Sequence, residues 1–245
     1  MDNGIYIALS RQLALFRDMA ETTNNISNAN TTGFQAEKMI FSAYLDQDNN
    51  SGDRNKMAFA NDVSSYRYVQ EGAKRVTGNP LDVALQGNNS YFIVQTPLGN
   101  RYTRAGNFSL DGEGKLVTPE GYPVLDTSGQ ALEFPPDTQE VIIGSAGNIK
   151  INGEDFGSIG VAQFENPQLL TQTFGGLYQS EVEPTIGNEE TVRMSQGALE
   201  GANVQPITEL THMIDVSRSV GSTAKYIETI YDLQRKTTNT WTQQG

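Results

Sequence analysis

The chain has 245 residues, of which 29 are acidic and 17 are basic, so its formal net charge is −12. It contains no cysteine and one histidine, His212, which excludes disulfides, thiolate metal sites, cysteine nucleophiles and multi-histidine metal sites. This length can bury a substantial core, as one large domain or two modest ones.

The negative charge is concentrated in the middle of the chain. Residues 111–200 hold fifteen acidic and three basic side chains, whereas residues 1–110 hold ten of each and residues 201–245 hold four of each. An acidic middle argues against nucleic acid or anionic lipid as a partner. No apolar run reaches the roughly 18 residues of a membrane-spanning helix, so no membrane insertion is expected. The start, MDNGIYIALSRQ, carries an acidic residue where a signal peptide has basic ones, so we expect no cleavable signal peptide.

The first segment has the spacing of an amphipathic helix. Apolar and small residues recur at steps of three and four, and Gly33 is a plausible stop. The resulting seam comprises Leu9, Leu13, Phe16, Met19, Ala20, Thr23, Ile26 and Asn30.

The end of this segment, NNISNANTTGF, is unusual because no charged residue occurs between Thr22 and Ala36. Asn24, Asn25 and Asn28 lie mostly opposite the seam, where a solvated helix would carry charges. Four asparagines cost a helix about 2 to 3 kcal/mol relative to alanine. A face pressed against a second helix benefits from having no charge to desolvate. We therefore expect this helix to fold when neighbours cover both faces; the alternative is a frayed helix end that runs into a loop.

The middle of the chain reads as β structure. Short β-prone runs are separated by turn signals such as Asp111-Gly112 and Asn152-Gly153, which predicts an antiparallel sandwich or open barrel. The expected strands are Ser90–Thr96, Arg101–Arg104, Asn107–Leu110, Lys115–Thr118, Val141–Gly144, Asn148–Ile151 and Ile159–Phe164. The polar segment Asp46–Asp62 reads as a linker or exposed loop.

The last segment predicts one long amphipathic helix, roughly residues 203 to 240. Pro206 suits a first helical turn, and apolar residues follow at helical spacing. They are Ile207, Leu210, Met213, Ile214, Val216, Val220, Ala224, Ile227, Ile230 and Tyr231. The predicted fold is a mainly β body with amphipathic helices at both ends, which pair as a coiled-coil-like domain. Such ends bury their apolar stripes against each other or against another molecule.

The sequence contains no complete catalytic motif among those that we tested. Gly112-Glu113-Gly114 begins a dinucleotide fingerprint, but Val117 stands where its third glycine belongs. Adjacent acids such as Glu154 and Asp155 read as ordinary surface residues. We expect no catalytic, cofactor-binding or metal site, and no enzyme activity.

Several long motifs resemble the flagellar rod and hook family of axial proteins. The first is Asn24-Asn25-Ile26-Ser27-Asn28-Ala29-Asn30-Thr31-Thr32-Gly33-Phe34, in which Gln35 follows instead of the usual basic residue. The others, in order, are Gly78 to Gly87, Tyr102 to Phe108, Gly114 to Thr118, and Leu199 to Val204. In the terminal helix, Ser217 to Gly221 departs from the family's Gln-Arg-aromatic run.

The resemblance implies a structural subunit of the bacterial flagellar rod, the periplasmic drive shaft that transmits torque from motor to hook. The opening Ile5-Tyr6-Ile7-Ala8-Leu9-Ser10 looks like the proximal part of the rod. The implied partners are copies of itself, other rod proteins and the flagellar type III export apparatus, with contact to peptidoglycan or ring proteins open. The implied division is an axial helix over 1–35, a connection over 36–75, a β-rich outer domain over 76–200 and a second axial helix over 201–245.

In this family the terminal helices of many subunits pack side by side, which assigns an assembly interface to both ends of the chain. The expected interface residues are Leu9, Leu13, Phe16, Met19, Asn24, Asn25, Ile26, Asn28, Asn30, Gly33, Phe34, Ile207, Leu210, Ile214, Val220, Ile227 and Tyr231.

Three other functions are open at this point. The chain could be a distal rod or other hook-basal-body axial subunit. It could be a secreted β-rich carbohydrate-binding module, with an aromatic platform drawn from Tyr66, Tyr68, Tyr91 and Tyr102. A polysaccharide-cleaving enzyme would need a dedicated carboxylate pair.

Overall fold

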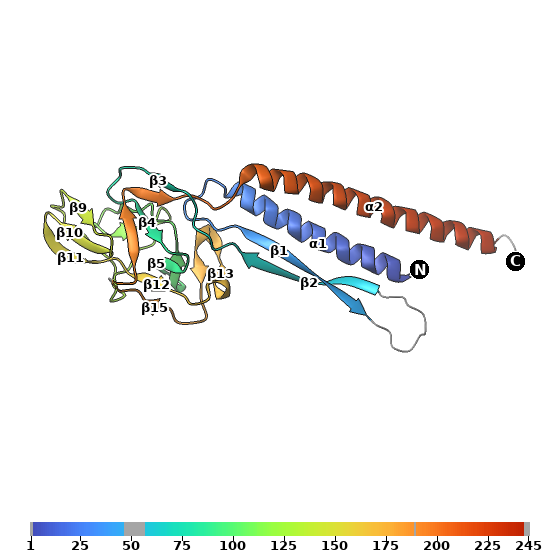
Figure 1. Ribbon diagram of the computed structural model, residues 1–245, viewed down its shortest axis with the longest axis horizontal. Helices are drawn as coiled ribbons and strands as arrows, with labels where there is room; N and C mark the ends of the chain where they lie inside the picture. Colours follow the sequence, from blue (N-terminus) through green and yellow to red (C-terminus); the bar gives the residue numbers. More distant parts are fainter. Residues whose placement is uncertain (1, 47–56, 189, 243–245) are drawn as a thin grey trace. The chain divides into compact units, whose positions relative to one another are not determined.

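The computed structural model describes residues 2–46, 57–188 and 190–242, and the chain divides into two compact units (Figure 1). The helical unit comprises Met1–Ser27, Glu37–Tyr66 and Gln205–Gly245. The β unit comprises Asn28–Ala36 and Arg67–Val204. Each unit is therefore built from segments that are distant in sequence.

The helical unit contains two helices and a two-stranded sheet. Helix α1 spans Asp2–Ser27 and helix α2 spans Pro206–Thr242, which confirms both expected terminal helices. The helices are antiparallel: Asn25 near the end of α1 contacts Glu209 near the start of α2. Strands β1 (Glu37–Asp46) and β2 (Met57–Arg67) pair with each other.

Helix α1 ends six residues before the expected stop at Gly33. Beyond Ser27 the chain turns, with the Thr31 amide donating to the Asn28 carbonyl at 3.0 Å and the Thr31 hydroxyl donating to Asn28 Oδ1 at 3.1 Å. Asparagine and threonine side chains compete for such local hydrogen bonds, which explains the early end. Gly33 does adopt a left-handed conformation, with φ of 69°, but it does so inside the β unit.

The segment expected as a connection contains strands. Within residues 36–75, β1 and β2 pair with each other, and β3 (Lys74–Val76) begins just before the end of this range. Residues 57–62 of the polar segment belong to β2, while residues 47–56 lie outside the described part of the chain.

The β unit is antiparallel in every pairing recorded for its strands, which confirms the predicted mainly β body. Its largest sheet has six strands in the order β13-β14-β6-β5-β12-β15, and a second has three in the order β11-β10-β9. Three further pairs are β16-β4, β17-β3 and β7-β8. The bounds are β4 Val83–Gln86, β5 Ser90–Thr96, β6 Gly99–Thr103, β7 Ser109–Leu110, β8 Leu116–Val117, β9 Val141–Ile143, β10 Asn148–Ile151, β11 Glu154–Ser158, β12 Val161–Gln163, β13 Thr171–Gln172, β14 Tyr178–Gln179, β15 Thr185–Ile186, β16 Arg193–Gln196 and β17 Ala198–Glu200.

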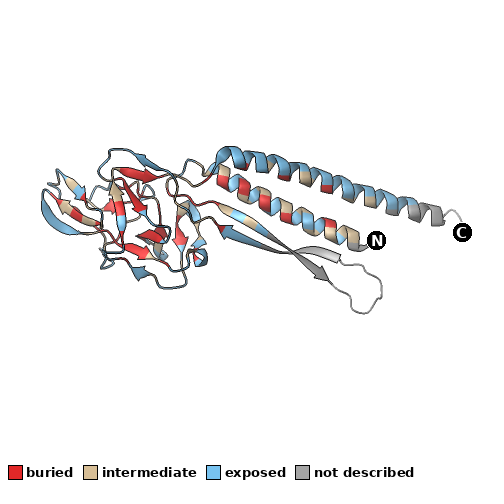
Figure 2. Cartoon of the chain, viewed as in Figure 1, coloured by how far each residue is buried: buried red, intermediate tan, exposed pale blue. Residues whose placement is uncertain are grey.

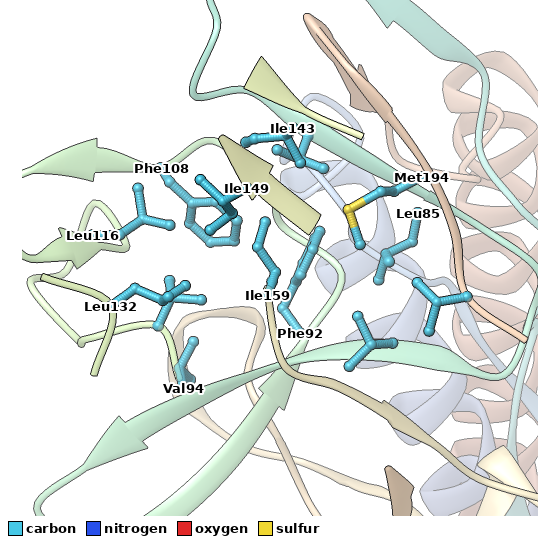
Figure 3. Close-up of a cluster of buried hydrophobic side chains, with 14 of the residues drawn as sticks. Leu85, Phe92, Val94, Phe108, Leu116, Leu132, Ile143, Ile149, Ile159 and Met194 are labelled. Atoms are coloured by element: carbon cyan, nitrogen blue, oxygen red, sulfur yellow. The ribbon is translucent and has the colours of Figure 1, made fainter. Parts of the chain in front are cut away.

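Strand β5 organises the hydrophobic core because both of its faces are buried. Phe92 and Val94 point into the larger cluster, which Figure 3 shows together with Leu85, Ile149 and Met194 among others. Tyr91 and Ile93 point into a second cluster with Tyr102, Phe164 and Tyr178. This alternation follows from the two-residue period of a strand.

A buried ion pair joins distant segments of the β unit. The Arg104 and Glu200 side chains are 0% and 2% exposed, and Glu200 Oε2 accepts from Arg104 Nη2 at 2.6 Å and from Nε at 2.9 Å. Arg104 Nη1 also donates to the Gly87 and Ser90 carbonyls, while Glu200 Oε1 accepts from the Gly72 amide at 3.1 Å. Every charge is thus satisfied by several partners, as a buried pair requires.

The segment Asn28–Ala36 is held against the same place. The Gly33 amide donates to the Glu200 carbonyl at 2.8 Å, and a Cβ on Gly33 would lie 2.5 Å from the Ala105 amide nitrogen. The Asn203 side chain accepts from the Ala36 amide at 2.7 Å and donates to the Gln70 carbonyl at 2.8 Å. We call this set of contacts around Arg104, Glu200 and Asn203 the polar knot.

Removing one partner of the buried ion pair leaves the other charge buried and unmatched. Glu200→Ala is expected to lower the free energy of unfolding by about 3 to 5 kcal/mol, measured by urea denaturation of the full chain. Glu113→Ala is the control, because it breaks an exposed pair with Lys115 and should leave the denaturation midpoint almost unchanged. Equal midpoints for the two variants would contradict the role given to the knot.

In the polar knot, the backbone at Gly72 lies close to the backbone at Gly201, and the absence of a side chain on Gly72 permits this. A Cβ on Gly72 would lie 1.9 Å from the Gly201 carbonyl oxygen, so Gly72→Ala forces the backbone to move. We expect a loss of about 1 to 3 kcal/mol or more. Gly157→Ala is the matched control, because its Cβ would meet open space at an ordinary φ. Thermal denaturation of both variants tests this; an unchanged melting temperature for Gly72→Ala would refute the packing argument.

Candidate assembly interface

Helices α1 and α2 contact each other through a narrow seam that is largely polar on the α1 side. The buried residues of α1 are Ala8, Ala14, Asp18, Thr22 and Asn25. On α2 the buried and half-buried positions, apart from Ser219, alternate in steps of four and three: Glu209, Met213, Val216, Val220, Thr223, Ile227 and Ile230. Larger apolar residues of α1 such as Ile7 and Leu15 are only half-buried, so the fully buried part of the seam takes little apolar surface from α1.

Asn25 is the most fully buried residue of this seam and ties three elements together. Its side-chain amide donates to the Glu37 carbonyl at 2.7 Å, and its Oδ1 accepts from the Glu37 amide at 3.1 Å. It also approaches Glu209 Oε2 at 3.4 Å. One asparagine thereby fixes the start of β1 and the start of α2 against the end of α1.

Two turns towards the start of α1, the seam is closed by Asp18 and His212. Asp18 Oδ1 lies 3.0 Å from His212 Nε2, and the Thr22 hydroxyl donates to the Asp18 carbonyl at 2.8 Å. Neither Asp18 nor Glu209 was expected in the seam, because the helical wheel was read from apolar residues. The sequence does contain a pattern that could have found them: Asp18 and Thr22 are four residues apart, and they precede Asn25 by seven and three residues.

These side chains line a cavity of about 270 Å³ inside the helical unit, together with Glu21, Glu37 and Lys38. Burial raises the pKa of the Glu21 carboxyl, and the negative charge of Glu37 raises that pKa further. Among the residues that line this cavity, acidic side chains outnumber basic ones. Among the residues the structure describes, no group of three acidic or histidine side chains is arranged to hold a metal ion.

The predicted apolar seam of α1 lies on its exposed side. Tyr6, Leu9, Leu13 and Phe16 recur at steps of three and four and are 64%, 47%, 56% and 49% exposed. The sequence left two partners open for these apolar residues, the other terminal helix or another molecule. Within the chain, the smaller residues Ala8 and Thr22 occupy the side of α1 that faces α2. We call Tyr6, Leu9, Leu13 and Phe16 the α1 stripe.

Helix α2 is exposed over most of its described length (Figure 2). Ile207, Leu210 and Ile214 are 82%, 48% and 53% exposed, and we call them the α2 stripe. Tyr226, Tyr231 and Leu233 are also largely exposed, whereas Val220 and Ile227 are half-buried in the seam.

The remaining expected interface residues are divided between the two units. In α1, Asn24 is exposed, while Met19 and Ile26 are half-buried. In the β unit, Asn30 is exposed, Asn28 is half-buried, and Gly33 and Phe34 are buried. Phe34 packs with Ala36 and Val204, so it belongs to the core of the β unit.

The structure argues against an aromatic platform for carbohydrate. Tyr91 is 0% exposed and Tyr102 is 8% exposed, because both belong to the core beside β5, and Tyr68 is only half-exposed. Burial also raises the pKa of the Tyr91 hydroxyl. Among the described residues, no helix is long and apolar enough to cross a membrane.

Three family models match the chain, and together they reach from its start to its C-terminal helix. Residues 5–35 match the flagella basal body rod protein model. Residues 84–151 match the flagellar hook protein FlgE/F/G D1 domain. Residues 195–240 match the C-terminal model of the flagellar basal body rod FlgEFG proteins.

Curated relatives match over almost the whole chain. The flagellar basal-body rod protein FlgF of Caulobacter vibrioides is 33% identical, with 96% of both chains covered. FlgF of Mesorhizobium japonicum is 34% identical over 91% of both chains, and the rod protein FlgG of Bacillus subtilis is 31% identical over 88% of this chain and 90% of its own. With this identity over nearly the full length, the chain belongs to the flagellar basal-body rod proteins, a family of structural subunits and not of enzymes.

Proposed function

We propose that this chain is a subunit of the proximal part of the flagellar rod and polymerises through its terminal helices to transmit torque from motor to hook. The observation that carries this proposal is the pair of exposed apolar stripes on α1 and α2. Within the chain, α1 and α2 meet through a small, largely polar seam. Large apolar side chains of both helices therefore remain available for contacts with other subunits.

The energetics support polymerisation through the stripes. Burying a large apolar side chain contributes about 1.5 to 3 kcal/mol, and each stripe residue still exposes roughly half of its surface or more. Seven such residues offer enough apolar area to hold helices of neighbouring subunits together. The residues of each stripe also recur at steps of three and four, the spacing of helices that pair in coiled coils.

The same features suit export as an unfolded chain. We infer passage through the flagellar type III apparatus without a cleaved signal. The chain has no cysteine to form a premature disulfide, and α1 is weakened by its asparagines and by a seam of limited apolar area. Such a helix gains much of its stability only on assembly.

The proximal position is supported by the opening Ile5 to Ser10, which resembles the proximal rod protein. The distal rod, or another axial position between basal body and hook, is the runner-up. The proposed partners are copies of this chain, adjacent rod proteins and the export apparatus, while peptidoglycan or a ring protein would meet the acidic region 111–200.

Polar substitution of the α1 stripe separates assembly from folding. Leu9→Ser combined with Leu13→Ser should abolish rod formation, yet lower the stability of the isolated protein little, since both residues are about half exposed. Basal bodies in electron micrographs and urea denaturation of the purified protein give the two readouts. Leu98→Ser is the control, because it removes a leucine that is 83% exposed in the β unit. Normal rods with the double variant would rule out the stripe as an assembly surface.

Deletion of the gene tests the position in the rod. Basal bodies from the deletion strain should lack the proximal rod and everything beyond it, and a complementing copy should restore them. A rod that is complete proximally but truncated near the hook would place the subunit distally. Intact rods with normal swimming would overturn the proposed function.

A further inference from the structure

Strand β3 presents a basic and apolar edge on the β unit. β17 is its only strand partner in the described chain, through the pairs Val76–Ala198, Arg75–Leu199 and Lys74–Glu200. All three residues of β3 are exposed, and Val76 is 84% exposed. Lys74 forms an ion pair with Glu71 at 3.0 Å, whereas Arg75 has no ion-pair partner among the described residues. β3 therefore has an unpaired edge, a cation at Arg75 without an acidic partner in the described chain, and an exposed valine. These groups are available to contact another molecule.

The loop before β15 has the opposite charge and also exposes a valine. Val182 is 55% exposed and stands between two exposed acids, Glu181 and Glu183. The Ser180 hydroxyl donates to the Val182 carbonyl at 2.6 Å and accepts from the Val182 amide at 3.0 Å, which fixes this turn. Neither acid forms an ion pair within the described residues; the charge of Glu183 instead contributes to the raised pKa of Tyr102, whose main cause is burial.

We propose that the β3 edge of one subunit, centred on Arg75 and Val76, docks on the Glu181–Val182–Glu183 loop of a second copy of this chain. This inference rests on the proposed function and adds to it a contact between β units. Charge complementarity selects the pairing, since Arg75 gains carboxylate partners that it lacks within its own chain. The two valines meet at the centre of the contact and exclude water there.

The placement of the two surfaces accounts for growth of a rod. β3 and β15 lie on opposite sides of the β unit (Figure 1), so one subunit uses both surfaces at once. A contact between two different surfaces of the same chain is heterologous, and it repeats into an open helical array unless the rotation closes it into a ring. A two-fold contact of one surface with itself would stop at a dimer. Each contact is small, and its strength comes from repetition beside the helical contacts.

Cysteine crosslinking tests the contact directly, because the chain contains no cysteine of its own. Val76→Cys and Val182→Cys are introduced together into the full-length chain, expressed in the deletion strain, and basal bodies are oxidised. The predicted result is a ladder of covalent multimers of this chain, because the Cα atoms must approach within about 7 Å for a disulfide. Each single variant should give only monomer, and co-expression of the two single variants should stop at dimer.

The control is Val76→Cys with Leu98→Cys, which pairs the same edge with a residue elsewhere on the β unit that is more exposed than Val182, 83% against 55%. It should give no ladder. Dimer from Val76→Cys alone would overturn the heterologous arrangement. Normal rods and swimming without a ladder in the Val76→Cys, Val182→Cys strain would overturn this contact and leave the rod function standing. Absence of rods with the parent chain itself would instead count against the proposed function.

Charge reversal gives a second readout that needs no crosslink. Arg75→Glu, and separately Glu181→Arg with Glu183→Arg, should each reduce the number of complete rods and the swimming diameter, because like charges then face each other. Combining all three substitutions should restore both. Lys115→Glu, elsewhere on the β unit, should have no effect. Failure of the combined variant to recover above either parent variant, with all proteins folded by circular dichroism, would refute the pairing.

Discussion

The buried Arg104–Glu200 ion pair is the interaction on which the rest of the β unit depends. Its partners are backbone groups of Gly72, Gly87 and Ser90, and the backbone of Glu200 itself receives the Gly33 amide. The segments that enter and leave the β unit, near residues 33, 72 and 200, are therefore fastened at one place. A charge buried this completely tolerates no loss of a partner, so these segments are committed to a single geometry.

The helical unit differs from the β unit in that it leaves large apolar side chains uncovered. In an ordinary helical hairpin the largest apolar residues face the partner helix. Here Asp18, Thr22 and Asn25 occupy that side of α1, and Leu9, Leu13 and Phe16 face outwards. Polar contacts between the helices, Asn25 with Glu209 and Asp18 with His212, define one register of the hairpin while contributing less stability than an apolar seam. Register is therefore set within the chain, and apolar area is left for contacts outside it.

The sequence allowed the helices and the central strands to be predicted, because their periodicity is local. β5 and β10 were placed correctly, and the antiparallel class followed from regular turn signals. The strands that were not predicted, such as β4, β16 and β17, are short, and their partners lie more than 100 residues away. No local pattern encodes such pairings. β1 and β2 were taken for a connection because the polar residues between them dominate that stretch.

The residues of the candidate interface stay a prediction, and the structure adds which side of each helix they occupy. The helical wheel separates Leu13 from Asn25 correctly, yet it cannot say which side the partner helix of the same chain takes. Leu9, Leu13 and Phe16 lie on the exposed side of α1, which favours contact with another molecule over contact with the other helix, the two alternatives that the sequence left open. The absence of charge between Thr22 and Ala36 was the better signal, since Asn25 is buried against α2 and β1. In this subunit the buried Asn25 therefore marks the contact within the chain, and the exposed apolar side of α1 is the one that we propose for contacts between chains.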